Sequence, residues 1–125
     1  MRKSALYHIA NPKSIVFFGA SNNFNRMGTI ILDSLKALGF NGPVYPIHPK
    51  ETRVLGYDAY SSVEELPETP ELAIIVLPTN IVIQNLEACG RQGTRHAVIV
   101  SGGFKEVGGK GPEMEARLKE TADRY

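Results

Sequence analysis

The sequence predicts an α/β fold, in which a doubly wound, mainly parallel sheet of about five strands carries helices on both faces. Short runs of consecutive apolar residues alternate along the chain with longer segments in which apolar residues follow helical spacing. Unbroken apolar runs are typical of strands covered on both faces, as in a parallel sheet. Glycine or proline separates most of these segments, which predicts short turns between them.

The first strand is predicted over residues 14–19, where four apolar residues run without a break. We expect Gly19 to turn the chain sharply and to leave space for a ligand. A helix from about Arg26 follows, with Gly28 at its start and Gly39 as its stop. A strand, a glycine turn and a helix together direct backbone N–H groups and a helix N-terminus at a phosphate.

The second strand is predicted over residues 44–47, and it runs into a proline-rich turn. Pro49 restricts His48 to extended geometry, so Lys50 leaves the strand from a fixed place. A short edge strand is expected over residues 56–60.

A brief helix is predicted next, because the sequence has a capping-box pattern, either Ser61 with Glu64 or Ser62 with Glu65. The most apolar run of the chain, residues 72–77, predicts a central buried strand. Residues 78–90 follow as a helix, a turn falls at Gly93, and residues 97–100 predict another buried strand.

The last strand leads into Ser101, Gly102, Gly103 and Phe104, followed by a glycine-rich loop and a final helix that opens at Pro112. A short helical turn is expected over residues 4–10. Because a doubly wound sheet normally continues after such a helix, we expect residues 1–125 to be one domain of a longer multidomain protein.

Composition excludes several classes of protein. The net charge is +1, which argues against a broad nucleic-acid footprint or a polybasic membrane surface, so any anion site must be local. A single cysteine, Cys89, excludes a disulfide framework and favours a cytoplasmic location; its helical surroundings predict a buried structural thiol.

The ends of the predicted strands carry glycine, proline and small hydroxyl side chains, which is typical of a ligand-binding edge. They hold no spaced carboxylate pair, and the three histidines lack zinc-ligand spacing, so the pattern indicates a nucleotide-binding domain without catalytic residues or a metal site. The glycines do not form the G-x-G-x-x-G dinucleotide fingerprint. The fingerprint also expects an acidic residue about 20 residues further on, where this chain has residues 39–42. The end of the next strand offers Lys50 and no carboxylate, and a lysine suits a phosphorylated ribose.

Each candidate also has a simpler interpretation. Ser21 and Asn22 could form the turn without contacting a ligand. Lys50 could be a solvated surface lysine, and residues 101–103 could be a tight turn. Phe104 could cover a ligand or anchor the loop in the core.

Five segments together resemble the N-terminal CoA-binding domain of ADP-forming acyl-CoA synthetases, which are ligases. The resemblance extends over residues 6–125 and includes the succinyl-CoA synthetase α subunit and some protein acetyltransferases. It is carried by residues 11–21, 42–50, 54–67 and the strand ends at 72–78 and 101–106.

The resemblance implies a Rossmann-like fold that binds coenzyme A or acyl-CoA. It places the phosphates at Gly19, Ala20, Ser21 and Asn22, with Gly28 at the helix start. It places Pro49 and Lys50 at the adenosine phosphate, and Pro78 and residues 101–104 along the adenine and pantetheine path. The full reaction interconverts acyl-CoA, ADP and phosphate with acid, CoA and ATP, and it uses other domains or subunits. This domain alone is therefore expected to bind CoA and not to catalyse.

Two departures from the family pattern stand out. Residues 22–27 are bulkier than usual, although Arg26 could add a charge, and His48 replaces an asparagine and is expected to be a bystander. A regulatory or scaffolding module with altered ligand binding is the alternative function. An NADP-dependent oxidoreductase domain is a third, against which the missing fingerprint counts.

Overall fold

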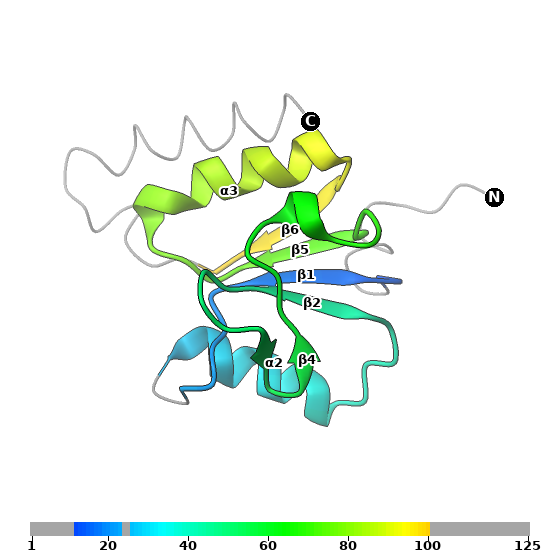
Figure 1. The fold of residues 1–125 in the computed structure, drawn as a ribbon, viewed down its shortest axis with the longest axis vertical. Helices are drawn as coiled ribbons and strands as arrows, with labels where there is room; N and C mark the ends of the chain where they lie inside the picture. The colour runs from blue at the N-terminus through cyan, green and yellow to red at the C-terminus, as the bar shows by residue number, and fades with distance from the viewer. Residues whose placement is uncertain (1–11, 24–25, 101–125) are drawn as a thin grey trace.

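The computed structural model describes residues 12–23 and 26–100, and a four-stranded parallel sheet forms its centre (Figure 1). The strands lie in the order β2 (Val44–Ile47), β1 (Ile15–Phe18), β5 (Leu72–Ile75) and β6 (His96–Ile99). Their register is continuous, because Ile15 pairs with both Val44 and Leu72, and Leu72 pairs with His96. The chain adds β2 on one side of β1 and then adds β5 and β6 on the other side, so the strand order switches between β1 and β5. We call this position the reversal point, and it confirms the doubly wound prediction.

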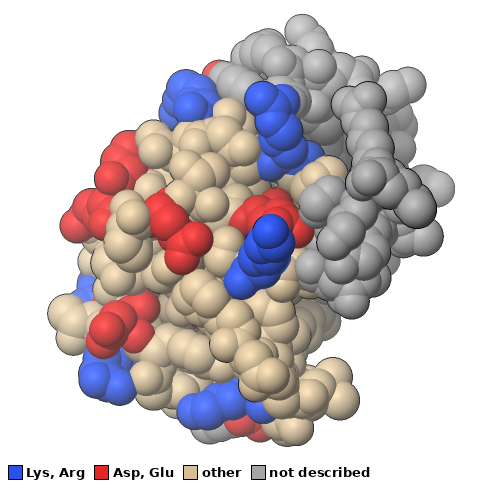
Figure 2. Space-filling model, turned by 90° about the vertical axis from the view of Figure 1, so that its right-hand side faces the viewer, with Lys and Arg blue, Asp and Glu red and all other residues tan. Residues whose placement is uncertain are grey.

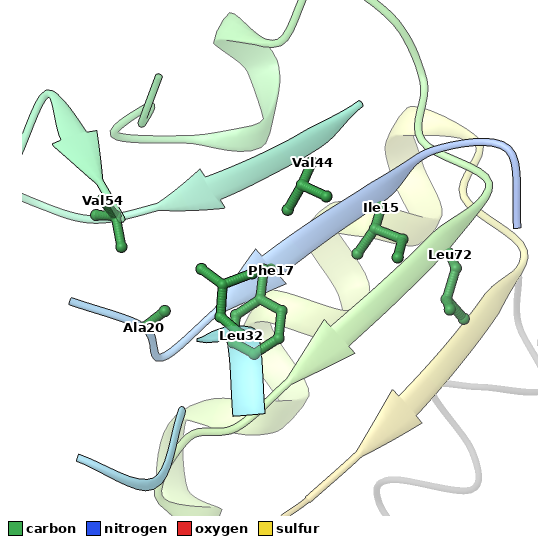
Figure 3. Close-up of a cluster of buried hydrophobic side chains, with 7 residues drawn as sticks. All are labelled: Ile15, Phe17, Ala20, Leu32, Val44, Val54 and Leu72. Carbon is green, nitrogen blue, oxygen red and sulfur yellow. The ribbon is translucent and has the colours of Figure 1, made fainter. Parts of the chain in front are cut away.

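Helices cover both faces of this sheet. Figure 1 shows α2 (Met27–Ala37) and α3 (Thr79–Gln92) on opposite sides, and both begin at the end where the strands finish. Because side chains alternate along a strand, β1 contributes Ile15 and Phe17 to one core and Val16 and Phe18 to the other. Leu32 of α2 packs in the first core (Figure 3), and Val82 of α3 packs in the second.

A small two-stranded hairpin, β3 (Arg53–Val54) with β4 (Tyr57–Asp58), follows β2. The prediction of an edge strand over residues 56–60 was therefore only partly right. Gly56 and Leu55 adopt positive φ values of 88° and 50° and turn the chain back on itself, and only Tyr60 bridges to Ile47 at the outer side of β2. Val54 packs in the α2-side core (Figure 3).

The predicted brief helix is confirmed as a 3₁₀ turn, η1 (Val63–Glu65), but the predicted capping box is wrong. The Ser61 and Ser62 hydroxyls donate to the carboxylate of Glu65, and no side chain caps the backbone of this turn. The described residues hold four main-sheet strands where about five were predicted, since the expected edge strand became the hairpin. The helical turn predicted at 4–10, the loop at 101–104 and the final helix lie outside the described residues.

The surface shows no concentration of one charge on the face in Figure 2, where lysine and arginine alternate with aspartate and glutamate. This agrees with the net charge of +1 and supports the expectation that any anion site is local.

Candidate functional site

Two adjoining hollows lie at the ends of the parallel strands, next to the point between β1 and β5 where the chain reverses direction. We call them together the crevice. Their volumes are about 370 and 280 Å³, so the first lies within the range of small-ligand sites and the second just below it. Both are bordered by Gly19, Arg26 and Leu77. The first hollow adds Ala20, Ser21, Asn23, Ile47, His48 and Pro49, and the second adds Met27, Gly28, Val76, Pro78 and Val100.

Gly19 and Gly28 bring the crevice walls together by close backbone packing. Gly19 has a φ of 100°, and a Cβ there would lie 1.9 Å from the carbonyl oxygen of Val76. A Cβ on Gly28 would lie 2.2 Å from the carbonyl oxygen of Gly19. The side-chain space at Gly19 is thus filled by Val76, the residue that follows β5. The structure therefore explains this glycine by packing and backbone conformation, where the sequence suggested clearance for a ligand.

Thr29 fixes the turn that follows β1, and sequence reasoning missed it. Its side chain is fully buried, and its hydroxyl accepts from the Ser21 N–H at 2.9 Å and donates to the Ser21 carbonyl at 3.1 Å. The Ser21 hydroxyl lies 3.3 Å from it and accepts from the Asn23 N–H at 3.0 Å. A threonine in the first turn after a glycine-containing loop is the sequence signal that could have revealed this network.

The N-termini of α2 and α3 border the crevice through Arg26 and Pro78, their N-cap residues. The first N–H groups of a helix lack intrahelical partners and carry the positive end of the helix dipole. Among the described residues, neither helix has a side-chain cap at this end or an acidic residue in its first turn. This arrangement, with the exposed guanidinium of Arg26 beside it, favours a bound anion.

The turn after β2 forms the opposite wall. The backbone of His48 donates to the Tyr60 carbonyl at 2.8 Å, and the side-chain Nδ1 accepts from the N–H groups of Lys50 and Glu51 at 3.0 and 2.9 Å. His48 and Pro49 border the crevice, whereas Lys50 is exposed and borders neither hollow. The residue expected to be a bystander thus lies closer to the site than its charged neighbour.

Asn22 connects the turn after β1 to the hairpin. Its side-chain amide donates to the carbonyl of Arg53 at 2.9 Å, and its oxygen accepts from the N–H of Leu55 at 3.0 Å. The side chain is thus engaged away from the crevice, and its direct role in binding a phosphate stays a prediction.

Most predicted site residues therefore come together at one edge of the sheet. Those that border the crevice are Gly19, Ala20, Ser21, Arg26, Gly28, Pro49 and Pro78. Asn22 and Lys50 lie in turns beside it, and residues 101–104 lie outside the described residues, directly after Val100 of the second hollow. That these residues contact a ligand stays a prediction.

Three further questions about function concern metal ligands, membrane-spanning helices and a reactive thiol in the described part of the chain. It holds no group of three residues suited to a metal ion, and none of its helices has the length and apolar character needed to cross a bilayer. Burial raises the pKa of the Cys89 thiol to about 12, with a smaller contribution from the charge of Glu64, which agrees with the predicted structural role.

The parallel sheet, the reversal point and the helix N-termini at one crevice define a Rossmann-like, nucleotide-binding class of α/β domain. Within this class, the chain belongs to the CoA binding domain family, whose pattern it matches over residues 13–124. The resemblance to the CoA-binding domain of ADP-forming acyl-CoA synthetases is thereby confirmed.

Characterised relatives are much longer than this chain. It is 41% identical, over 99% of its length, to an ADP-forming acetate–CoA ligase of Methanocaldococcus jannaschii, and it covers 17% of that protein. It is 40% identical to the α subunit of ADP-forming acetate–CoA ligase II of Pyrococcus furiosus, of which it covers 26%. The solved acetyl-coenzyme A synthetase 1 of Candidatus Korarchaeum cryptofilum superposes with a TM-score of 0.89 at 36% identity, over 96% of this chain and 26% of that one.

Proposed function

We propose that this chain binds coenzyme A in the crevice, as the CoA-binding domain of a longer ADP-forming acyl-CoA synthetase. The observation that carries the proposal is that two uncapped helix N-termini and Arg26 border one crevice at the sheet's reversal point. Membership of the CoA binding domain family supports the choice of ligand.

The crevice residues fit the parts of CoA by their chemistry. N–H groups at the start of α2 and the Arg26 guanidinium suit the pyrophosphate, since both are donors with positive charge. Ser21 and Thr29 hold the turn after β1 in shape by their shared hydrogen bonds. Ile47, Leu77 and Pro78 supply the apolar surface that the adenine or pantetheine portion needs.

In the parent enzyme, this domain would present CoA as the acyl acceptor, while acid, ATP and phosphate are handled elsewhere. Among the described residues of the crevice, no hydrogen bond joins the one hydroxyl, of Ser21, to the one imidazole, of His48, so we assign the chain binding and no catalytic step. The other domains or subunits of that synthetase are then its partners, and we infer a cytoplasmic location for the whole enzyme.

Calorimetric titration of the purified chain with CoA and with dephospho-CoA tests this proposal. We expect saturable CoA binding with a dissociation constant between about 1 μM and 1 mM. No heat of binding and no thermal shift at millimolar CoA would overturn it and would favour the regulatory or scaffolding alternative. Equal affinity for the two ligands would remove the role proposed for Lys50 at the ribose phosphate.

A further inference from the structure

We propose that His48 contacts the bound nucleotide directly, by donating its Nε2–H to the phosphate on the ribose. This inference rests on the proposed function, because it assigns a residue to one phosphate of the same ligand. It replaces the expectation that His48 is a bystander, and three features of the structure carry it.

The first feature is the tautomer. The Nδ1 atom of His48 accepts two backbone N–H groups, from Lys50 and Glu51, so it carries no proton of its own in this arrangement. The neutral ring must then carry its proton on Nε2. That atom is a hydrogen-bond donor pointing away from the two amides, and no acceptor for it is found among residues 12–23 and 26–100.

The second feature is rigidity. The backbone of His48 is held by Tyr60, whose N–H in turn donates to the carbonyl of Pro46 at 2.9 Å. The ring is fixed by two further bonds of 3.0 and 2.9 Å. A donor held in advance loses little conformational entropy when a ligand arrives.

The third feature is position. His48 is half-buried and borders the first hollow together with Ser21 and Arg26. It stands at the end of β2, the strand next to β1, and in sheets of this class that strand end faces the ribose of the nucleotide. The ribose of CoA carries a phosphate that dephospho-CoA lacks, so the two ligands separate this contact from contacts to the pyrophosphate.

Asparagine offers a variant that separates the two roles of His48. Its side-chain oxygen stands the same number of bonds from the backbone as Nδ1 and can accept the N–H groups two and three residues later, as in an Asx turn. The shorter amide cannot reach as far as Nε2. His48→Asn therefore keeps the turn and removes the proposed contact, whereas His48→Ala removes both.

The experiment compares CoA and dephospho-CoA by calorimetry for the unmodified chain, His48→Asn and Lys50→Ala, with thermal unfolding of each. We expect His48→Asn to keep its melting temperature, to bind CoA about 10-fold or more weakly and to bind dephospho-CoA unchanged. Unchanged CoA affinity in His48→Asn, or an equal loss for both ligands, would overturn the assignment. If only Lys50→Ala abolished the preference for CoA, the lysine and not His48 would hold the phosphate.

A measurement on the unmodified chain keeps the proposal falsifiable should His48→Asn fold poorly. Long-range ¹H–¹⁵N spectra of the imidazole should show the Nε2–H tautomer, with the Nε2 signal shifting on addition of CoA and much less with dephospho-CoA. An Nδ1–H tautomer, or an Nε2 signal indifferent to CoA while CoA binds, would refute it. Absence of any CoA binding would instead remove the proposed function.

Discussion

Replacing Gly28 by alanine tests whether close packing of α2 on the turn after β1 shapes the site. In an isolated helix this change would stabilise by about 1 kcal/mol, because alanine is the better helix former. Here the added Cβ would lie 2.2 Å from the carbonyl oxygen of Gly19, where ordinary contacts fall at 3.4–4 Å. The obstacle is backbone, which cannot rotate away as a side chain could, so the helix must move.

The magnitude follows from what that movement disturbs. Helix and turn must separate by roughly 1 Å, and forced overpacking of this kind costs about 1–3 kcal/mol. Thr29 is the next residue, and its two hydrogen bonds to the Ser21 backbone would stretch, at about 1 kcal/mol each. After the helix-propensity gain, we expect a net loss of about 3 kcal/mol.

Chemical denaturation and thermal unfolding measure this directly. For a domain of this size, about 3 kcal/mol lowers the melting temperature by roughly 10 °C. Ser34→Ala, at an exposed position of the same helix, serves as the control and should change stability by less than about 0.5 kcal/mol. A Gly28→Ala chain as stable as the unmodified protein, or more stable, would refute the packing argument.

Three further predictions concern single side chains. Thr29→Val should lower stability by about 1–3 kcal/mol in denaturant titrations, because it leaves the part-buried Ser21 N–H without its acceptor. Thr29→Ser, which keeps the hydroxyl, should retain most of that stability. Arg26→Ala should weaken CoA binding about 10-fold and leave the melting temperature unchanged. The difference in CoA affinity between this variant and the unmodified chain, measured by calorimetry, should shrink at high salt. A loss of affinity that does not depend on salt would argue against a charge contact. The pKa of the Cys89 thiol is raised to about 12 in the folded chain, so this thiol should resist alkylation until denaturant is added. The thiol of the unfolded chain ionises above about pH 9, so the contribution of Cys89 to stability should decline as the pH rises beyond that value. Rapid labelling of the native chain, or a decline with pH that persists unchanged in Cys89→Ala, would contradict this.

The helices and main strands could be predicted because their signals are local. An unbroken apolar run at residues 15–18 and another at 72–75 mark buried parallel strands, and Gly39 ends α2 with a φ of 83°. Alternation of strands and helices then requires parallel pairing, which brings the strand ends to one edge. The general position of the site followed from the sequence in this way.

The details that failed depend on neighbours distant in the chain. The segment at 56–60 has strand composition, but the positive φ of Leu55 and Gly56 folds it back as a hairpin. The predicted contact of Asn22 with a phosphate stays a prediction, but its hydrogen bond to Leu55, 33 residues away, could not be foreseen from the local sequence. Local periodicity contains no information about such contacts.

The sequence by itself determined the class of fold, the order of its elements, the edge where a ligand would bind, and the family resemblance that points to CoA. Tertiary structure alone decided which side chains face that edge. It filled the space beside Gly19 with Val76, turned Asn22 toward the hairpin, buried Thr29 beneath the turn and placed His48 at the crevice instead of Lys50. The physical reason is that the pattern of apolar residues selects elements through burial, whereas the direction of a polar side chain is set by hydrogen-bond partners that only the folded chain brings within reach.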